Sequence, residues 1–163
     1  MKENQMKEKI KQLARENAGE FVANRRHLHQ NPELSYQEYN TQKYVAERLK
    51  EIGITPTSIA NTGLVATIEG RNPSSKVVAL RADMDALPII EANDVVYKSL
   101  NQGVMHACGH DVHTASLLGV SKILHTLRHE FDGTVKLVFQ PARKSSWWCI
   151  SYDCGGCFVE PKA

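Results

Sequence analysis

The sequence has no long apolar run and no strong excess of charge of either sign. No stretch approaches the roughly 18 consecutive apolar residues of a membrane span, and the charged residues 1–11 lack the apolar core of a signal peptide. The net charge is only +2 and the basic residues are scattered, which argues against nucleic acid or an anionic membrane as partner. We therefore expect a cytoplasmic protein that acts on a small molecule or a peptide.

Cysteine is scarce and unevenly placed. Cys108 stands alone in the body of the chain, and the other three, Cys149, Cys154 and Cys157, lie in the last fifteen residues. A disulfide framework is therefore not expected in a reducing compartment. The chain also has no fixed-period repeat and no low-complexity segment long enough to act as a linker. With 163 residues, 42% of them hydrophobic, it is long enough to bury one core.

Helical periodicity marks three segments of the chain. Residues 3–30 follow one amphipathic pattern, which predicts a single helix that stops at the Asn31-Pro32 pair. A capping-box pattern at residues 35–38 predicts the start of a second helix, with Gly53 just past its end. A third helix is predicted over residues 112–130.

Apolar and β-branched runs predict strands between these helices. Residues 54–60 and 64–68 indicate two strands joined by a turn. Residues 76–80 and 134–139 have the nearly continuous apolar character of interior strands in a parallel sheet. These last two enclose the third helix, so they form a right-handed βαβ unit, in which ligands bind beyond the carboxyl ends of the strands. The predicted fold class is α/β, with helices flanking a mixed or parallel sheet.

A dense group of metal-binding residue types lies just before the third helix. Residues 103–113 contain three histidines, Cys108 and one acid within eleven positions. The positive end of a helix lowers the pKa of a thiol, and a thiolate beside an imidazole suits zinc or a neighbouring first-row ion. Taken singly, the cysteine is more often a small buried residue and each histidine more often bonds a loop carbonyl. Their density favours a metal site, with Cys108 and His110 as the ligands.

Further candidates for this site are weaker. Asp83 and Asp85 follow the apolar run 76–80 at the end of a predicted strand, where they either bind the ion or orient a histidine. Asp111 alternatively caps the helix, His113 alternatively bonds a ligand, and His106 is the weakest candidate. Two histidines two residues apart point to different helix faces, so His27 and His29 are expected to be ordinary surface residues.

Three stretches of the sequence together resemble a known family. They are residues 26–35, residues 81–88 and residues 106–113, and the similarity runs from about residue 20 to Ala142. The family is that of the metallo-aminoacylases, which includes hippurate hydrolases, N-acyl-amino-acid amidohydrolases and plant auxin-conjugate hydrolases. The resemblance implies that residues 1–142 are the N-terminal part of a zinc-peptidase-like catalytic domain, incomplete because nothing corresponds to the family's second, dimerising domain or to its later histidine ligands.

The same resemblance implies a reaction and its residues. The family uses two divalent ions, Zn, Mn, Co or Ni, to hydrolyse N-acyl-amino acids to a carboxylate and an amino acid. Cys108 would bridge the ions, His110 would bind one of them, and Asp85 would be a supporting acid. Where the family has Gln-Pro-Ala-Glu-Glu, with a general base and a ligand, this chain has two cations, Arg143 and Lys144. We therefore expect no intact catalytic residue, weak metal binding and no useful turnover.

Residues 143–163 depart from the family and lose all apolar periodicity, which predicts an irregular tail. Read one base later, the codons for Trp147-Trp148 force Gly-Gly, and the text that follows is compatible with the family's, which suggests a shifted reading frame. The alternative function is a small zinc- or thiol-binding module built on Cys149, Cys154 and Cys157, although a structural zinc site normally needs four ligands. A third hypothesis is a non-catalytic partner of an intact relative.

Overall fold

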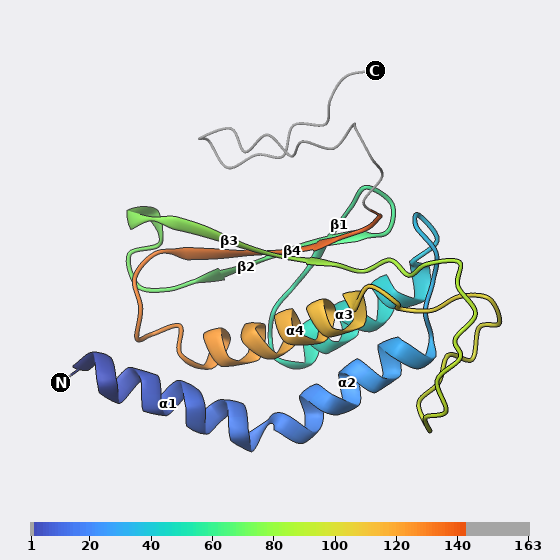
Figure 1. Ribbon diagram of the computed structural model, residues 1–163. Coiled ribbons are helices and arrows are strands. Elements are labelled where there is room, and N and C mark those ends of the chain that lie inside the picture. The colour runs from blue at the N-terminus through green and yellow to red at the C-terminus, as the bar shows by residue number, and fades with distance from the viewer. Residues whose placement is uncertain (1, 143–163) are drawn as a thin grey trace.

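The computed structural model describes residues 2–142, in which four helices and a four-stranded sheet form layers (Figure 1). Helices α3 and α4 lie against one face of the sheet, and α1 and α2 form a further layer beneath them. No helix in this part of the chain is both long and apolar enough to cross a membrane. The elements in chain order are α1 (Lys2–Glu16), α2 (Ala18–Gln30), α3 (Tyr39–Glu51), β1 (Thr57–Ile59), β2 (Gly63–Glu69), the 3-10 turn η1 (Pro73–Ser75), β3 (Val77–Asp83), α4 (His110–Thr126) and β4 (Thr134–Gln140).

The sheet is mixed, with the strand order β1-β2-β4-β3. Strands β1 and β2 pair antiparallel, as do β2 and β4, whereas β3 and β4 pair parallel. The unit β3–α4–β4 confirms the predicted βαβ arrangement and the α/β fold class. The interior position predicted for residues 76–80 is wrong, because β3 is an edge strand of the described sheet and Val77 and Val78 are exposed. In its register Asp83 stands opposite Gln140, so the carboxyl ends of both strands open at the same edge. That edge is where the long segment 84–109 leaves β3 and returns to α4.

The core lies between the sheet and the helices α3 and α4. Val45 and Leu49 from α3 belong to the same hydrophobic cluster as Leu137 and Phe139 from β4, and all four are fully buried. Each such side chain contributes about 1.5–3 kcal/mol through removal from water. The last four residues of β4 are also buried. This end of the strand lies at the sheet edge where ligands were predicted to bind.

The single helix predicted over residues 3–30 is wrong, because the structure has two helices that meet at Asn17. The Asn17 side-chain amide donates to the Leu13 carbonyl oxygen at 2.8 Å. Asparagine competes in this way with backbone bonding and weakens a helix interior. Apolar periodicity continues across the joint, so the pattern alone did not reveal it.

The second helix begins later than its capping-box pattern indicated, at Tyr39. Ser35 does not cap it, because its hydroxyl donates to Asp85 Oδ2 at 2.8 Å. The backbone N–H of Thr41 is instead satisfied by the Glu33 carboxylate at 2.8 Å. Glu38 is fully buried, where it accepts from Thr62 Oγ1 at 2.6 Å and from the Ala142 N–H at 2.9 Å. The third helix runs from His110 to Thr126, rather than over 112–130.

Candidate metal centre

Three possible ligands meet where β3 ends and α4 begins. Asp83 is the last residue of β3, His110 is the first of α4, and His113 follows one turn later. One ligand atom from each lies within 4.8 Å of the other two. Asp83 is buried and His113 is exposed, so the group is anchored on one side and open to solvent on the other. A carboxylate and two imidazoles in this arrangement can hold a divalent ion.

Local chain geometry explains why the two histidines share a face. Residues three apart on a helix are neighbours, and the His110 and His113 ring centroids are 5.5 Å apart. The helix starts abruptly because Gly109 has φ +78°, a left-handed conformation that residues with a side chain rarely adopt. At the other end of the site, Thr114 Oγ1 donates to the Asp83 carbonyl oxygen at 2.9 Å and ties α4 to β3.

His110 is held in one orientation by Asp85. Its Nδ1 lies 2.9 Å from the Asp85 carbonyl oxygen and 2.9 Å from Asp85 Oδ1. Both of these atoms are acceptors, so Nδ1 is the donor, and in the neutral ring Nε2 then carries the lone pair that can bind an ion. A carboxylate that orients an imidazole in this way is the usual support of a metal-bound histidine. The Asp85 carboxylate is itself fixed by the hydroxyl of Ser35.

Asp83 is shared between the possible metal position and a cation. Arg81 donates to Asp83 Oδ1 and also to the Gln140 side chain. The other oxygen, Oδ2, lies 4.0 Å from His113 Nδ1. The guanidinium reduces the negative charge that Asp83 offers to an ion, which favours weak over tight binding.

Cys108, the main cysteine candidate, is not a member of the group that the described residues 2–142 form. It is exposed and unpaired, two residues before His110. The structure therefore groups His110 with Asp83 and His113, two of the weaker candidates. A role for Cys108 as a ligand stays a prediction. The cysteines of the tail, together with Arg143 and Lys144, lie outside the described residues.

Asp111 is buried and contacts two residues of α2. It is 1% exposed, and its Oδ2 lies 2.8 Å from Arg25 Nε and 2.8 Å from His29 Nδ1. It does not cap α4, whose N-cap is Gly109 without a side-chain bond. The surface position predicted for His29 is wrong, because this residue is 4% exposed and contacts Asp111 of α4 and Glu91 of segment 84–109. His27 is exposed as expected and stacks on Tyr44 with ring centroids 3.9 Å apart.

His106 is buried and 4% exposed, and neither ring nitrogen has a hydrogen-bond partner within the described part of the chain. Burial lowers its pKa from 6.5 to about 4, while the neighbouring carboxylates of Asp111 and Asp85 partly oppose the shift. The side chain is therefore neutral near pH 7. In the sequence His106 is simply a histidine two residues before Cys108. That pattern does not distinguish a buried neutral side chain from a metal ligand.

Stability should consequently depend on His106 as the pH falls. The unfolded chain takes up this proton near pH 6.5 and the folded chain only near pH 4, so stability drops through that interval. Replacing His106 by glutamine should flatten the fall in melting temperature between these two values. Thermal melts of both proteins in metal-free buffer measure the difference, and parallel profiles would contradict the assignment of His106 as a buried neutral ring.

Comparisons with known proteins cover most of the chain. Residues 79–142 match the family described as Peptidase family M20/M25/M40. The chain is 48% identical to the Thermostable carboxypeptidase 2 of Saccharolobus solfataricus, over 84% of this chain and 35% of that protein. It is also 48% identical to the N-acyl-L-amino acid amidohydrolase of Geobacillus stearothermophilus, over 85% of this chain and 37% of that protein.

A solved structure gives the same result for the fold. A Bacillus subtilis protein described as a dinuclear metal binding peptidase from the M20 family superposes with a TM-score of 0.73 and 44% identity. The match covers 76% of this chain and 35% of that one. The chain thus spans about a third of the length of the relatives that it matches.

Proposed function

The chain belongs to Peptidase family M20/M25/M40, and we propose that it is a part of a metal-dependent amidohydrolase that acts on N-acyl-amino acids. The Geobacillus relative, named for that substrate class, supports the choice of substrate. A small-molecule substrate and a cytoplasmic location belong to the same proposal. The observation that carries it is the meeting of Asp83, His110 and His113 within 4.8 Å of one another.

These residues fit a divalent first-row ion. Imidazole nitrogen and carboxylate oxygen are ligands for zinc and its neighbours, and a metal-binding imidazole needs the kind of support that Asp85 gives to His110. A bound ion would supply Lewis acidity toward an amide carbonyl. The residues of this chain would hold the ion and fix the protonated nitrogen of His110 away from it. Cys108, two residues before His110, is a further proposed ligand.

The proposal does not extend to turnover by this chain. In the related family a glutamate pair follows the strand that corresponds to β4, and here Arg143 and Lys144 occupy those places in the sequence. Arginine is not a base near neutral pH, and a lysine beside a metal ion would need its pKa lowered by several units. Gln140 ends β4 opposite Asp83, so the chain leaves the sheet at the metal edge just before these cations.

A combined metal and activity measurement tests both halves of the proposal. The purified chain should take up zinc, manganese or cobalt, and should release no amino acid from hippurate or from N-acetyl-amino acids with any of these ions. Metal-depleted chain is the control for uptake. Steady release of amino acid would contradict the predicted loss of activity, and a failure to take up any of the three ions would contradict the metal centre.

The alternative function rests on Cys149, Cys154 and Cys157, a zinc or thiol module outside the described residues. Serine at all three positions separates the two hypotheses. We expect metal uptake to persist in this variant, because the proposed ligands lie at Asp83, His110 and His113. Its loss would favour the tail as the binding site. The proposed shift of reading frame after Ala142 is tested by the nucleotide sequence around that codon.

A further inference from the structure

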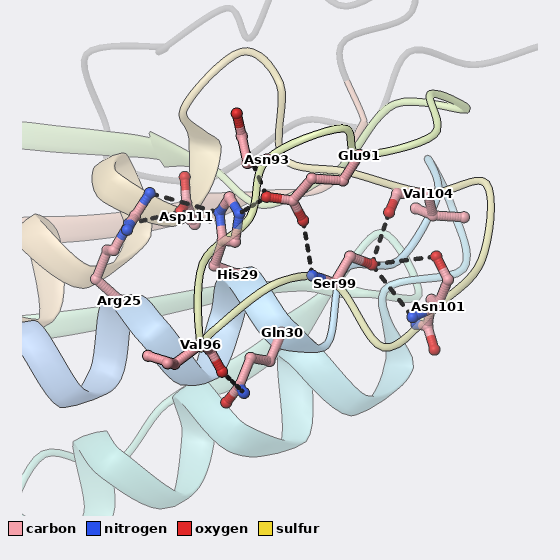
Figure 2. Close-up of polar contacts among 10 residues, drawn as sticks. All are labelled: Arg25, His29, Gln30, Glu91, Asn93, Val96, Ser99, Asn101, Val104 and Asp111. Atoms are coloured by element: carbon pink, nitrogen blue, oxygen red, sulfur yellow. Dashed lines mark hydrogen bonds and ion pairs between the residues drawn. The ribbon is translucent and has the colours of Figure 1, made fainter.

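A buried ionic cluster connects α2 to the first turn of α4, and Figure 2 shows its members. His29 lies between two carboxylates, with Nδ1 2.8 Å from Asp111 Oδ2 and Nε2 3.0 Å from Glu91 Oε1. His29, Glu91 and Asp111 are each less than 5% exposed. Arg25, one helical turn before His29, forms an ion pair with the same Asp111 oxygen at 2.8 Å. None of these contacts belongs to the metal group itself.

Shared contacts make this cluster a unit. Each ring nitrogen of His29 faces an oxygen of a different carboxyl group, so the ring bridges Asp111 and Glu91. The guanidinium of Arg25 faces the same Asp111 oxygen. Buried charges are tolerated when they are paired and hydrogen-bonded, and removing one partner leaves the other uncompensated. Loss of His29 would therefore disturb Asp111 as well as Glu91.

Glu91 extends the cluster into segment 84–109, which joins β3 to α4. Its other oxygen accepts from the Ser99 N–H at 2.7 Å, and Asn93 Nδ2 lies 3.2 Å from Oε1. Burial alone raises the pKa of Glu91, but hydrogen bonds from His29, Ser99 and Asn93 outweigh it and bring the pKa to about 2. The carboxylate is thus charged and well held. His29 joins α2, this segment and α4 through two contacts.

The position of Asp111 on α4 connects the cluster to the metal group. Asp111 follows His110 directly, so the two side chains leave the helix about 100° apart. His110 is fixed to Asp85 in one direction, and Asp111 is fixed to His29 in another. Two contacts in different directions hold the first turn against rotation about the helix axis. The same turn carries His113 beside His110, so its rotation sets how both imidazoles face Asp83.

We infer that His29 is a positioning residue of the metal centre: by binding Asp111 it fixes the first turn of α4, and with it His110 and His113 relative to Asp83. The inference rests on the proposed metal centre and adds to it a residue that never touches the ion. His29 reaches Asp111 across 82 positions in the sequence.

Metal affinity of the whole chain tests this role. Glutamine at position 29 keeps a side-chain amide that can donate a hydrogen bond, and alanine removes the polar contact altogether. With Co²⁺ alone as the probe, followed by its visible absorption, His29→Gln should bind about 10-fold more weakly, within the range seen when outer support of a metal ligand is lost. His29→Ala should bind more weakly still. Circular dichroism of each variant shows whether it is folded.

A matched control uses the same two helices away from the site. Lys122 of α4 pairs with Glu20 of α2 through an exposed ion pair, and Lys122→Met removes that contact. This variant should bind Co²⁺ as the unmodified chain does. Asp111→Asn should weaken binding as His29→Gln does, and His29→Gln in that background should cost little more, because His29 acts through Asp111. The asparagine variant carries the test if neither His29 variant folds.

The possible outcomes distinguish the positioning role of His29 from the existence of the metal centre. Unchanged Co²⁺ affinity in folded His29→Gln or Asp111→Asn would overturn the positioning role and leave the metal centre standing. Equal weakening in Lys122→Met would also overturn it, because the effect would then follow general loosening between α2 and α4. Failure of the unmodified chain to bind Co²⁺ would overturn the metal centre, and the role of His29 with it.

Discussion

Replacing His110 by alanine should lower the affinity of the chain for Zn²⁺ or Co²⁺ by more than about 100-fold, which exceeds the loss expected when only the outer support of a ligand is removed. His110 is the best oriented of the possible ligands, because Asp85 fixes its Nδ1 at 2.9 Å and leaves Nε2 free. Its loss removes one of three ligand atoms and also leaves the Asp85 carboxylate without this partner. Competition against a coloured chelator measures the change.

Two variants frame that experiment. His125→Ala changes a histidine in the last turn of the same helix, whereas His110 and His113 lie in its first turn. His125 is not a member of the metal group, so this variant should leave the affinity unchanged. Asp85→Asn keeps the size of the side chain but weakens the support of His110, and should lose about 10- to 100-fold. If His110→Ala bound the ion as well as His125→Ala does, the ion would have to sit elsewhere.

Reversing the charges at positions 143 and 144 should have the second large effect. The variant Arg143→Glu/Lys144→Glu is expected to bind a divalent ion about 100-fold more tightly, equivalent to about 3 kcal/mol. At an effective dielectric constant of about 20, one unit charge a few ångströms from a divalent ion is worth several kcal/mol before screening by salt. In the sequence the two positions follow Gln140, the register partner of Asp83, by three and four residues.

The neutral pair Arg143→Gln/Lys144→Gln is the matched control for charge reversal. It removes the repulsion without adding carboxylates, so its affinity should fall between those of the unmodified chain and the glutamate variant. Titration of all three with Zn²⁺ at two salt concentrations measures the electrostatic part, which salt should reduce. An affinity that is unchanged by both substitutions would show that the cations lie too far from the ion to explain weak binding.

The elements that local pattern determines were predicted correctly in type. Apolar, β-branched runs gave β3 and β4, and the helical pattern between them gave α4, so the parallel pair and its ligand edge followed from chain order alone. The meeting of Asp83 with the start of α4 follows from the same reasoning, because parallel strands end at one edge. The order of β3, α4 and β4 along the chain was sufficient to predict these features.

Other features depend on contacts that no local pattern encodes. His29 reads as one of two surface histidines on a helix, yet its partners Glu91 and Asp111 lie 62 and 82 residues away. The start of α3 shifted because Ser35 bonds Asp85, 50 residues away, instead of the helix. Cys108 is exposed and stands outside the group that Asp83 and His113 form with His110, and residue types alone did not show that.

X-ray absorption at the zinc edge of the zinc-loaded chain tests the metal centre most directly. Ligation by His110, His113 and Asp83 predicts a first shell dominated by nitrogen and oxygen at about 2.0–2.1 Å, with imidazole scattering beyond it. One sulfur at about 2.3 Å would add Cys108 to that shell. A shell of several sulfurs without imidazole scattering would contradict the assignment and place the ion in the cysteines of the tail.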